Sequence, residues 1–436
     1  MADKKASPAD LLGRGRGVLS LAARVAGQEI RHRARAAFGN EERASASEKS
    51  TRIAQAMAMV ESLGRMKGAL MKAGQLLSMD AGEWLPKEAL EVLGKLQGES
   101  EPMAFEVMRQ VIVEDLGTQS EALLAGLDEA PAAAASMGQV YRGMLDVPVA
   151  VKVQYPGIAD SIDSDIEALA TLSRGLLTLS RKPIDMEGLF RELADVLHHE
   201  ANYERERGYL ERFRFAVAND TRFIVPESLP QFSSRRVLTM TWQEGVPLGA
   251  WIKNEPSRDD VTRVSRDLLE LYCLEFFSWG MVQTDPNFGN FLIREDGRIV
   301  LLDFGATVEY EPEFRAQYMS LLRAVEKGDR AKILEEGIAF QLVDPREAKE
   351  SLEAFVDMLV CSAEPFAPSV QPFRFRDSDY NQRSREIVTR FIKGLVYSPP
   401  PKRLIFLHRK LGGLFQLLKR LDVELDLSPY WAKMTH

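Results

Sequence analysis

The sequence predicts an α+β fold in which helices precede and follow a short region of strands. Hydrophobic residues recur every three or four positions through the first ~120 residues, which indicates helices and no strand. Two runs of strand-forming residues follow, over residues 139–143 and 147–153. From Pro312 to the end of the chain the helical spacing returns.

The composition is that of an ordinary globular protein. The chain has 436 residues, of which 45% are hydrophobic and 28% charged, so a mainly disordered, collagen-like or fibrous chain is excluded. The only cysteines, Cys273 and Cys361, are too few for a disulfide framework or a cysteine-based zinc site. Such lone cysteines suit a reducing compartment. At about 150 residues per domain, the length corresponds to about three units.

The charge is unevenly distributed along the chain. The net charge is −8, so the chain as a whole lacks the basic surface of a nucleic-acid-binding protein. Residues 1–52 carry eleven Lys and Arg and six Asp and Glu, a local charge of +5 that leaves −13 for the remainder. With its apolar stripe over residues 18–26, this basic segment is predicted to contact an anionic membrane surface. A solvated tail is the alternative.

No apolar stretch is long enough to span a membrane, and the first residues do not have the pattern of a signal peptide. We therefore expect a cytoplasmic protein, peripheral at the inner face of the membrane if its basic segment binds lipid. Residues 1–44 form this basic, weakly amphipathic segment. Ser45 and Glu48 then have the spacing of a capping box. A helical extension is predicted over residues 45–127, with helices over residues 47–79, 87–96 and 103–116.

Residues 128–247 are predicted to form a small lobe. An alanine-rich turn that begins at Pro131 leads into the two strands described above. The elements expected after them are helices over residues 158–180 and 185–217 and strands over residues 223–225 and 236–242.

Residues 248–436 are predicted to form a larger, mainly helical lobe with a C-terminal extension. A helix is expected over residues 259–279, and two strands, 291–293 and 299–302, flank a turn at Asp296-Gly297. From Pro312 onward the chain is expected to be helical, except for a polar stretch over residues 373–384.

The first candidate functional residue is Lys152, which follows the apolar run Val149-Ala150-Val151. A buried ammonium is costly without an anionic partner, so a lysine in a buried strand predicts a carboxylate or phosphate beside it. The alternative is a lysine on an edge strand that points to solvent.

A second set of polar residues follows the predicted helix at residues 259–279. Asp285 and Asn290 are five residues apart, and Asp303 follows an apolar strand in the run Leu-Leu-Asp-Phe-Gly. Carboxylate and amide oxygens are ligands for Mg²⁺, and Asp285 is placed to orient or deprotonate a nucleophile. Each motif alone also occurs in ordinary turns. The order Val-Ala-Val-Lys, Asp-x4-Asn and Asp-Phe-Gly is that of the protein-kinase signature, and it predicts a kinase-like nucleotide site.

Two departures from ordinary protein kinases stand out. The phosphate-covering loop carries the alanines Ala132, Ala133, Ala134 and Ala135 before Ser136 and Gly138, where three glycines are usual. Because alanine resists positive φ, this loop is predicted to be stiffer. In addition, Gln283-Thr284 precedes Asp285 in place of His-Arg.

With these features the sequence resembles the UbiB (AarF-domain) family of atypical, protein-kinase-like proteins. The resemblance covers roughly residues 55–345 and rests on the alanine-rich loop, Gln-Thr-Asp-Pro-Asn, Leu-Leu-Asp-Phe-Gly-Ala-Thr and Lys72-Ala73-Gly74-Gln75. It implies a two-lobed, protein-kinase-like fold with helical N-terminal and C-terminal extensions.

The resemblance also implies roles for individual residues. Lys152 would reach the α- and β-phosphates of ATP, with Glu206 as its ion-pair partner, and Asn290 and Asp303 would bind Mg²⁺. Glu244 would lie at the hinge between the lobes, where the backbone holds adenine. Lys72 would pair with Glu200 and, with Gln75, occupy the side of the cleft where a protein kinase binds its peptide. Asn202 replaces the aspartate of the family's Glu-x-Asp motif.

The implied function is that of an atypical kinase or ATPase that binds Mg²⁺-ATP and supports isoprenoid-quinone (ubiquinone) biosynthesis or lipid handling. Its partners would be an isoprenoid lipid or quinone-biosynthesis proteins. The alternatives are a conventional protein or small-molecule kinase and a nucleotide-binding pseudokinase scaffold of a lipid-biosynthetic complex. The intact set of Lys152, Glu206, Asp285, Asn290 and Asp303 favours chemistry over scaffolding, and the Lys72–Gln75 motif argues against protein phosphorylation.

Overall fold

The computed structural model describes residues 102–135, 137–177, 186–285, 287–396 and 402–435. The alternation of helices and short strands confirms the predicted α+β class. The apolar stripe over residues 18–26 and the helices expected over residues 47–79 and 87–96 lie outside the described residues. Among the described residues the chain divides into two compact units, one with residues 102–103, 137–138 and 155–198 and one with residues 104–135, 139–154 and 199–435.

Two helices make up the described part of the first unit, α7 (Ile158–Leu177) and most of α8 (Met186–Glu200). The Nε2 atom of His198 on α8 lies 2.9 Å from Oδ1 of Asp163 on α7. Both helices were predicted, but the second was expected to continue to residue 217. It ends at Glu200, and α9 (Tyr203–Ala216) begins after a break at Ala201-Asn202.

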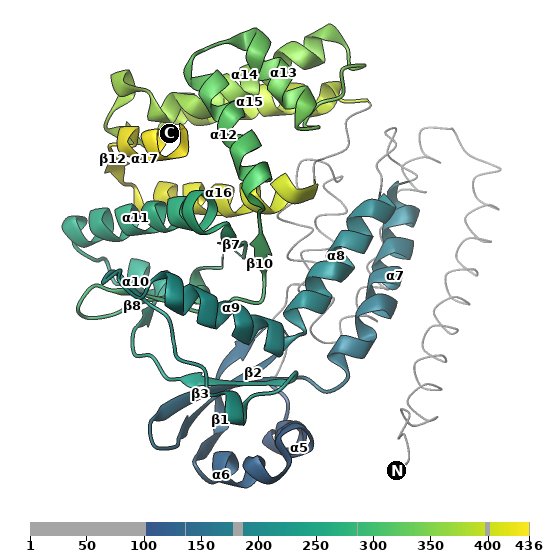
Figure 1. Ribbon diagram of the computed structural model, residues 1–436, viewed down its shortest axis with the longest axis vertical. Coiled ribbons are helices and arrows are strands. Elements are labelled where there is room, and N and C mark those ends of the chain that lie inside the picture. Colours follow the sequence, from purple (N-terminus) through teal and green to yellow (C-terminus); the bar gives the residue numbers. More distant parts are fainter. Residues whose placement is uncertain (1–101, 136, 178–185, 286, 397–401, 436) are drawn as a thin grey trace, which may run out of the picture. The chain divides into compact units, whose positions relative to one another are not determined.

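A four-stranded sheet in the second unit has the strand order β1-β2-β3-β5. Its strands are β1 (Leu127–Ala135), β2 (Gly138–Met144), β3 (Pro148–Gln154) and β5 (Val237–Thr241). β3 and β5 are antiparallel, with Lys152 opposite Leu238. The helices α5 (Phe105–Leu116) and α6 (Ser120–Ala125) lie beside this sheet (Figure 1). Asp115 joins α5 to β5 by accepting hydrogen bonds from Ser234 Oγ and Arg236 Nε.

The alanine-rich segment at Pro131 is the last part of strand β1, so the prediction of a turn there was wrong. Alanine has little preference for strands, and the segment is extended because it pairs with β2 at the edge of the sheet. Tertiary pairing therefore overrides local propensity at this position.

Six very short strands of the second unit form a second sheet and a two-stranded ribbon. A second sheet has the order β4-β9-β8-β6, and β7 pairs with β10 in a separate ribbon. The strands are β4 (Phe223–Ile224), β6 (Val246–Pro247), β7 (Met281–Gln283), β8 (Phe291–Ile293), β9 (Ile299–Leu301) and β10 (Thr307–Glu309). Three of them were predicted. β6, β7 and β10 were not predicted.

Helices form most of the rest of the second unit. α11 (Arg258–Cys273) continues into a π-helical turn, η4 (Leu274–Trp279). The other helices are α10 (Leu248–Lys253), α12 (Pro312–Glu326), α13 (Arg330–Ala339), α14 (Lys349–Ala363), α15 (Ser378–Gly394), α16 (Lys402–Leu421) and α17 (Ser428–Thr435). A two-residue ribbon joins β11 (Phe373–Arg374) to β12 (Glu424–Leu425). The polar stretch expected to be non-helical up to residue 384 is helical from Ser378, because Asp377 caps α15.

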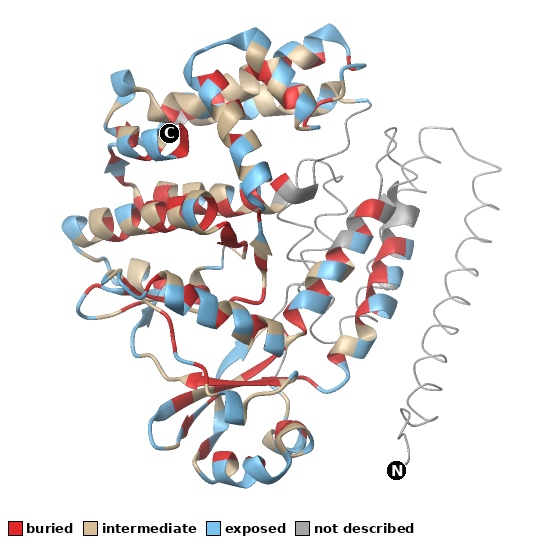
Figure 2. Cartoon of the chain, in the orientation of Figure 1, coloured by how far each residue is buried: buried red, intermediate tan, exposed pale blue. Residues whose placement is uncertain are grey.

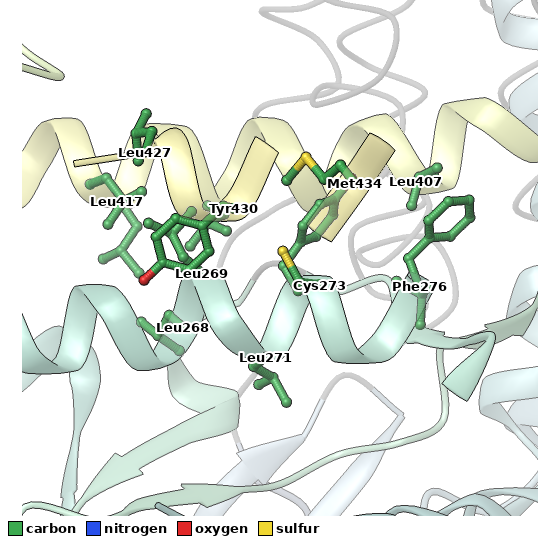
Figure 3. Packing of buried hydrophobic residues seen from close by; sticks show 14 of the residues in the cluster. Leu268, Leu269, Leu271, Cys273, Phe276, Leu407, Leu417, Leu427, Tyr430 and Met434 are labelled. Carbon is green, nitrogen blue, oxygen red and sulfur yellow. The ribbon is translucent and has the colours of Figure 1, made fainter. Parts of the chain in front are cut away.

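The core of this unit lies where α16 and α17 pack on α11. Figure 3 shows Leu269 and Cys273 of α11, with Phe276 of η4, among apolar side chains of the two C-terminal helices. Buried residues recur along one face of α11, as the red segments in Figure 2 show. No helix within the described ranges is both long and apolar enough to cross a membrane.

Candidate nucleotide and metal site

Lys152 lies in the interior of the small sheet. β3 has a neighbour on each side, β2 and β5, and Lys152 is only 8% exposed, which excludes the alternative of an edge-strand lysine facing solvent. Its Nζ atom lies 2.9 Å from both carboxylate oxygens of Glu206, on α9, and 3.3 Å from Oδ2 of Asp303. Three segments far apart in the sequence therefore meet at one ammonium group.

Burial and charge act against each other at this cluster. Burial works to lower the pKa of Lys152, but Asp303 and Glu206 raise it well above its usual value, so the ammonium stays protonated. The pKa of Glu206 is raised to about 7. Burial is the main cause, Lys152 acts against it, and Asp303 adds to it. Two carboxylates thus share one ammonium, and a further cation beside Asp303 would be favoured.

Asp285 and Asn290 lie on a loop that is tied at both ends to the segment around Asp303. At its start, Thr284 donates from its backbone N–H (3.2 Å) and its Oγ1 (2.7 Å) to the carbonyl of Ala306. At its end, the backbone N–H of Leu302 donates to the carbonyl of Asn290 at 2.8 Å. Within the loop, Nδ2 of Asn290 donates to Oδ2 of Asp285 at 3.3 Å. The pairing of β7 with β10 and of β8 with β9 therefore brings Asp285, Asn290 and Asp303 to one place.

Asp303 has an unusual backbone conformation, with φ of +58° in the left-handed region. Its Oδ1 accepts a hydrogen bond from the backbone N–H of Gly305 at 3.2 Å, and its carbonyl accepts one from Nε2 of Gln283 at 3.2 Å. The next residue, Phe304, is 2% exposed and packs on Phe213 of α9 with ring centroids 4.7 Å apart. These contacts stabilise a conformation that is costly for a residue other than glycine.

Arg205 is a residue of the site that the sequence motifs did not single out. Its guanidinium donates to the carbonyls of Gly305 and Thr307, at 2.7 Å each, and so fixes the chain after Asp303 to α9. The available signal was its position directly before Glu206, but arginines on helices are usually solvated.

Asn202 is the N-cap of α9. Its Oδ1 accepts a hydrogen bond from the backbone N–H of Arg205 at 3.1 Å, which starts the helix that carries Arg205 and Glu206. Asparagine and aspartate are about equally good at this position. The replacement of the family's aspartate therefore leaves the capping interaction in place.

The other residues predicted for the site do not contact Lys152, Glu206 or Asp303 in the hydrogen bonds and ion pairs described above, or lie outside the described residues. Glu200, the last residue of α8, is 8% exposed, and its Cα lies 3.6 Å from where a Cβ on Gly305 would be. Glu244 is exposed between β5 and β6 and accepts hydrogen bonds from Arg142 and Trp242. Ala132–Ala135 end strand β1 and Gly138 begins β2. Lys72, Gln75 and Ser136 lie outside the described residues.

The oxygen atoms of Asp303, Asn290 and Asp285 fit a hard cation such as Mg²⁺. Within the described part of the chain, no three His, Cys, Asp or Glu side chains lie together as a metal-binding group. Mg²⁺ is usually held in proteins through one or two carboxylates together with water and substrate phosphates. The donor set therefore fits a metal that arrives with a nucleotide.

A buried lysine paired with a helical glutamate, followed by an Asp/Asn loop and an Asp-Phe-Gly segment, defines a protein-kinase-like fold and site. The chain matches the ABC1 atypical kinase-like domain over residues 95–337, and it belongs to this family, also called UbiB. This confirms the family predicted from the motifs.

The chain is also similar to named atypical kinases and to a solved structure. The zebrafish (Danio rerio) atypical kinase COQ8B, mitochondrial, is 33% identical over 84% of this chain and 59% of its own length. The budding yeast (Saccharomyces cerevisiae) atypical kinase COQ8, mitochondrial, is 31% identical over 85% of this chain and 74% of its own length. The solved complex of Rv3197 with erythromycin from Mycobacterium tuberculosis has a TM-score of 0.60 and 25% identity. That alignment covers 84% of this chain and 92% of the other.

Proposed function

We propose that this chain is an atypical kinase or ATPase that binds ATP with Mg²⁺. The observation that carries the proposal is the contact of Lys152 with both Glu206 and Asp303, beside the loop that presents Asp285 and Asn290. A buried ammonium with a fixed counter-ion on one side, next to oxygen ligands for a cation, suits the phosphates of a nucleotide. The names of the relatives, atypical kinases, support the same activity.

Each residue has a defined part in this proposal. Lys152, held by Glu206, binds the α- and β-phosphates, and Asn290 and Asp303 hold Mg²⁺, which neutralises phosphate charge when bound. Asp285 orients or deprotonates the attacking water or hydroxyl group. Residues 132–136 and Gly138 cover the phosphates, and the backbone near Glu244 holds adenine. Arg205 keeps the segment after Asp303 in place.

For the biological role, we propose support of isoprenoid-quinone biosynthesis or lipid handling at an anionic membrane surface. The family and its motifs support the first part, and the +5 charge of residues 1–52 supports the second. Removal of residues 1–40 is expected to reduce co-sedimentation with anionic liposomes, and salt is expected to reduce it for the intact chain. Equal sedimentation of both forms would show that the basic segment is a solvated tail that does not bind the membrane.

The Lys72–Gln75 motif distinguishes this proposal from a conventional protein kinase. If Lys72 pairs with Glu200 and blocks the peptide side of the cleft, Lys72→Ala is expected to lower the melting temperature and to raise autophosphorylation from radiolabelled ATP. Lys72→Arg, which keeps the charge, is expected to do less. A Lys72→Ala protein that melts like the parent and gains no label would contradict the blocking role.

The central experiment measures ATP turnover and Mg²⁺-dependent thermal stabilisation by ATP, with and without anionic liposomes and headgroup analogues of quinone precursors. We expect turnover that requires Mg²⁺ and increases with liposomes. Nucleotide binding without turnover under every condition would favour the pseudokinase scaffold. No effect of ATP on the melting temperature would contradict the nucleotide site itself.

A further inference from the structure

Gln283 connects the C-terminal extension to Asp303. Its side-chain Nε2 donates to the carbonyl of Asp303, and its Oε1 accepts from Nζ of Lys410 at 3.4 Å. Lys410 lies on α16, 127 residues further along the chain. Among kinase-like sequences this position, two before the loop aspartate, is ordinarily a histidine. The side chain that replaces it here has two different ends, and each end meets a different partner.

Lys410 is fixed by a buried counter-ion. Its Nζ lies 3.0 Å from Oε2 of Glu275, and the exposed fractions of the two side chains are 8% and 2%. Glu275 lies on the π-helical turn η4; burial raises the pKa of its carboxyl group, while Lys410 and a hydrogen bond with the backbone of Gln283 act to lower it. Nζ also lies 5.7 Å from the ring centroid of Phe291, the residue after Asn290. A cation from the C-terminal extension thus lies near Gln283 and Phe291, the residues that flank the loop with Asp285 and Asn290.

The position of Lys410 on α16 is set by packing. Leu407, Leu414 and Leu417 are buried on the same helix, and Figure 3 shows Leu407 and Leu417 directed toward α11. The Lys410 side chain lines a small apolar pocket with Leu268, Leu271 and Phe288, so its methylene groups are packed while its ammonium reaches the polar cluster. The helix therefore cannot withdraw the ammonium without losing apolar contacts.

The two ends of the Gln283 amide make its orientation depend on Lys410. A carbonyl oxygen is attracted to an ammonium and an NH₂ group is repelled by it, so the cation holds Oε1 on its own side. Nε2 is then left to face the Asp303 carbonyl. Without the cation, the amide can turn over, and its oxygen would then oppose the carbonyl of Asp303. That carbonyl belongs to a residue whose φ of +58° needs support from its surroundings.

We propose that Lys410 is a positioning residue for the metal site: through Gln283 it holds Asp303 in the conformation that binds Mg²⁺. The C-terminal extension would then contribute to metal binding at the nucleotide site as well as to the stability of the fold. This inference rests on the proposed function, because it assigns a further residue to the same site.

The test compares Lys410→Met with a matched control. Lys433→Met also removes a lysine of the extension that is paired to a carboxylate of α11, since Lys433 Nζ lies 2.5 Å from Oε1 of Glu270, but it has no link to Gln283. For each full-length protein, the Mg²⁺ concentration that gives half of the thermal stabilisation by ATP is measured, with an ATP and EDTA arm. Loss of a residue that orients a metal ligand typically weakens metal binding by about tenfold or more. We expect that increase for Lys410→Met, no change for Lys433→Met, and unchanged binding of metal-free ATP.

Lys410→Met leaves Glu275 buried without its partner and could fail to fold, so the double variant Lys410→Met/Glu275→Gln is measured as well. It restores charge balance but supplies no cation to Gln283. We therefore expect it to regain thermal stability and keep the weakened response to Mg²⁺, and Gln283→Leu to share that weakened response. A double variant with the parent's Mg²⁺ dependence would overturn the positioning role and leave Lys410 a structural ion pair. A parent protein that does not respond to Mg²⁺-ATP would overturn the proposed function, and this role with it.

Discussion

The Nζ atom of Lys152 lies 3.3 Å from Oδ2 of Asp303, although 151 residues separate them in the sequence. The lysine expected at the phosphates and the aspartate expected at the metal therefore contact each other directly. Since the Asp303 side chain is about one third exposed, it is accessible to a cation from solvent, while Lys152 is enclosed. A bound cation would compete with Lys152 for the Asp303 carboxylate, and bound phosphates would compete with Asp303 for the Lys152 ammonium.

Replacement of Asp303 by Asn is expected to weaken Mg²⁺-dependent nucleotide binding and to reduce turnover about a hundredfold, the usual effect of losing one electrostatic group at a reacting centre. The amide keeps the shape and removes the charge. Turnover and nucleotide-dependent melting at several Mg²⁺ concentrations measure the effect. Asp296→Asn, at the exposed β8–β9 turn, is the control. If Asp303→Asn behaves like this control, the metal assignment fails.

Removal of the Lys152 charge is expected to destabilise the protein as well as its nucleotide complex. Lys152→Met leaves Glu206, 1% exposed, without its ammonium partner, which typically costs about 3–5 kcal/mol. The variant Lys152→Met/Glu206→Gln removes both charges and is expected to recover most of that loss. Urea unfolding of the parent, the two single variants and the double variant gives the coupling energy. Additive effects would show that the two groups do not depend on each other.

Arg205→Lys is expected to loosen the segment after Asp303. A lysine cannot donate to the carbonyls of Gly305 and Thr307 together in the fixed geometry of a guanidinium group. Each such hydrogen bond from a charged group is worth about 1.5–3 kcal/mol, so we expect faster amide exchange over residues 305–309 and lower turnover. Arg214→Lys, on the same helix and paired with the exposed Glu227 outside this segment, is the control. Equal exchange in the two variants would mean that Arg205 does not hold the segment.

The capping role of Asn202 gives a prediction with two arms. Asn202→Asp keeps an acceptor for the Arg205 N–H and is expected to leave stability and the Mg²⁺ dependence of turnover within a few-fold of the parent. Asn202→Ala removes the cap and is expected to cost about 1 kcal/mol. Urea unfolding and a Mg²⁺ titration of turnover measure both arms. A changed Mg²⁺ dependence in Asn202→Asp would instead show that the family's aspartate has a charge or metal role that this chain lacks.

Glu275 gives a pH-dependent difference in stability. Burial raises the pKa of its carboxyl group from 4.5 to about 7, although Lys410 acts to lower it. Between these values the folded state holds a proton that the unfolded state has released, so this group's contribution to stability is present below about pH 4.5 and is lost by about pH 7. Relative to Glu275→Gln, the parent is therefore expected to lose roughly 2–3 kcal/mol of unfolding free energy over that range. Urea unfolding of both proteins from pH 5 to pH 8 tests this, and a constant difference would contradict the raised pKa.

The sequence was sufficient for residues whose identity and spacing along the chain are themselves informative. Lys152 stands out because a lysine ends an apolar strand run, and Asp285, Asn290 and Asp303 because they recur in a fixed order. The long helices were predicted from their apolar spacing: α7 begins at residue 158 as expected, and α11 together with η4 spans residues 258–279 against an expected 259–279. Such signals are local, so a single sequence reveals them.

Arg205 and Lys410 could not be found in this way, and the sequence singled out Gln283 only by its place before Asp285, without its partners. Their partners lie 100 residues away for Arg205 and Gly305, 20 for Gln283 and Asp303, and 135 for Lys410 and Glu275. The ribbon of β7 and β10, which pairs Gln283 with Thr307, was not predicted from the sequence. Likewise, Pro131–Ala135 forms a strand because β2 is beside it, and not because of its own alanines.

By itself, then, the sequence determined the family and the class of chemistry that the family implies, and it singled out the polar groups now proposed for the site, because motif order and apolar spacing are local properties of the chain. The tertiary structure alone decided that Lys152 is shared between Glu206 and Asp303, and that Lys410 on α16 contacts Gln283, two residues before Asp285. The physical reason is burial: an ionised group withdrawn from water must find its counter-charge wherever the packed helices and paired strands place one. Which residue supplies that charge depends on the fold as a whole, and no local pattern records it.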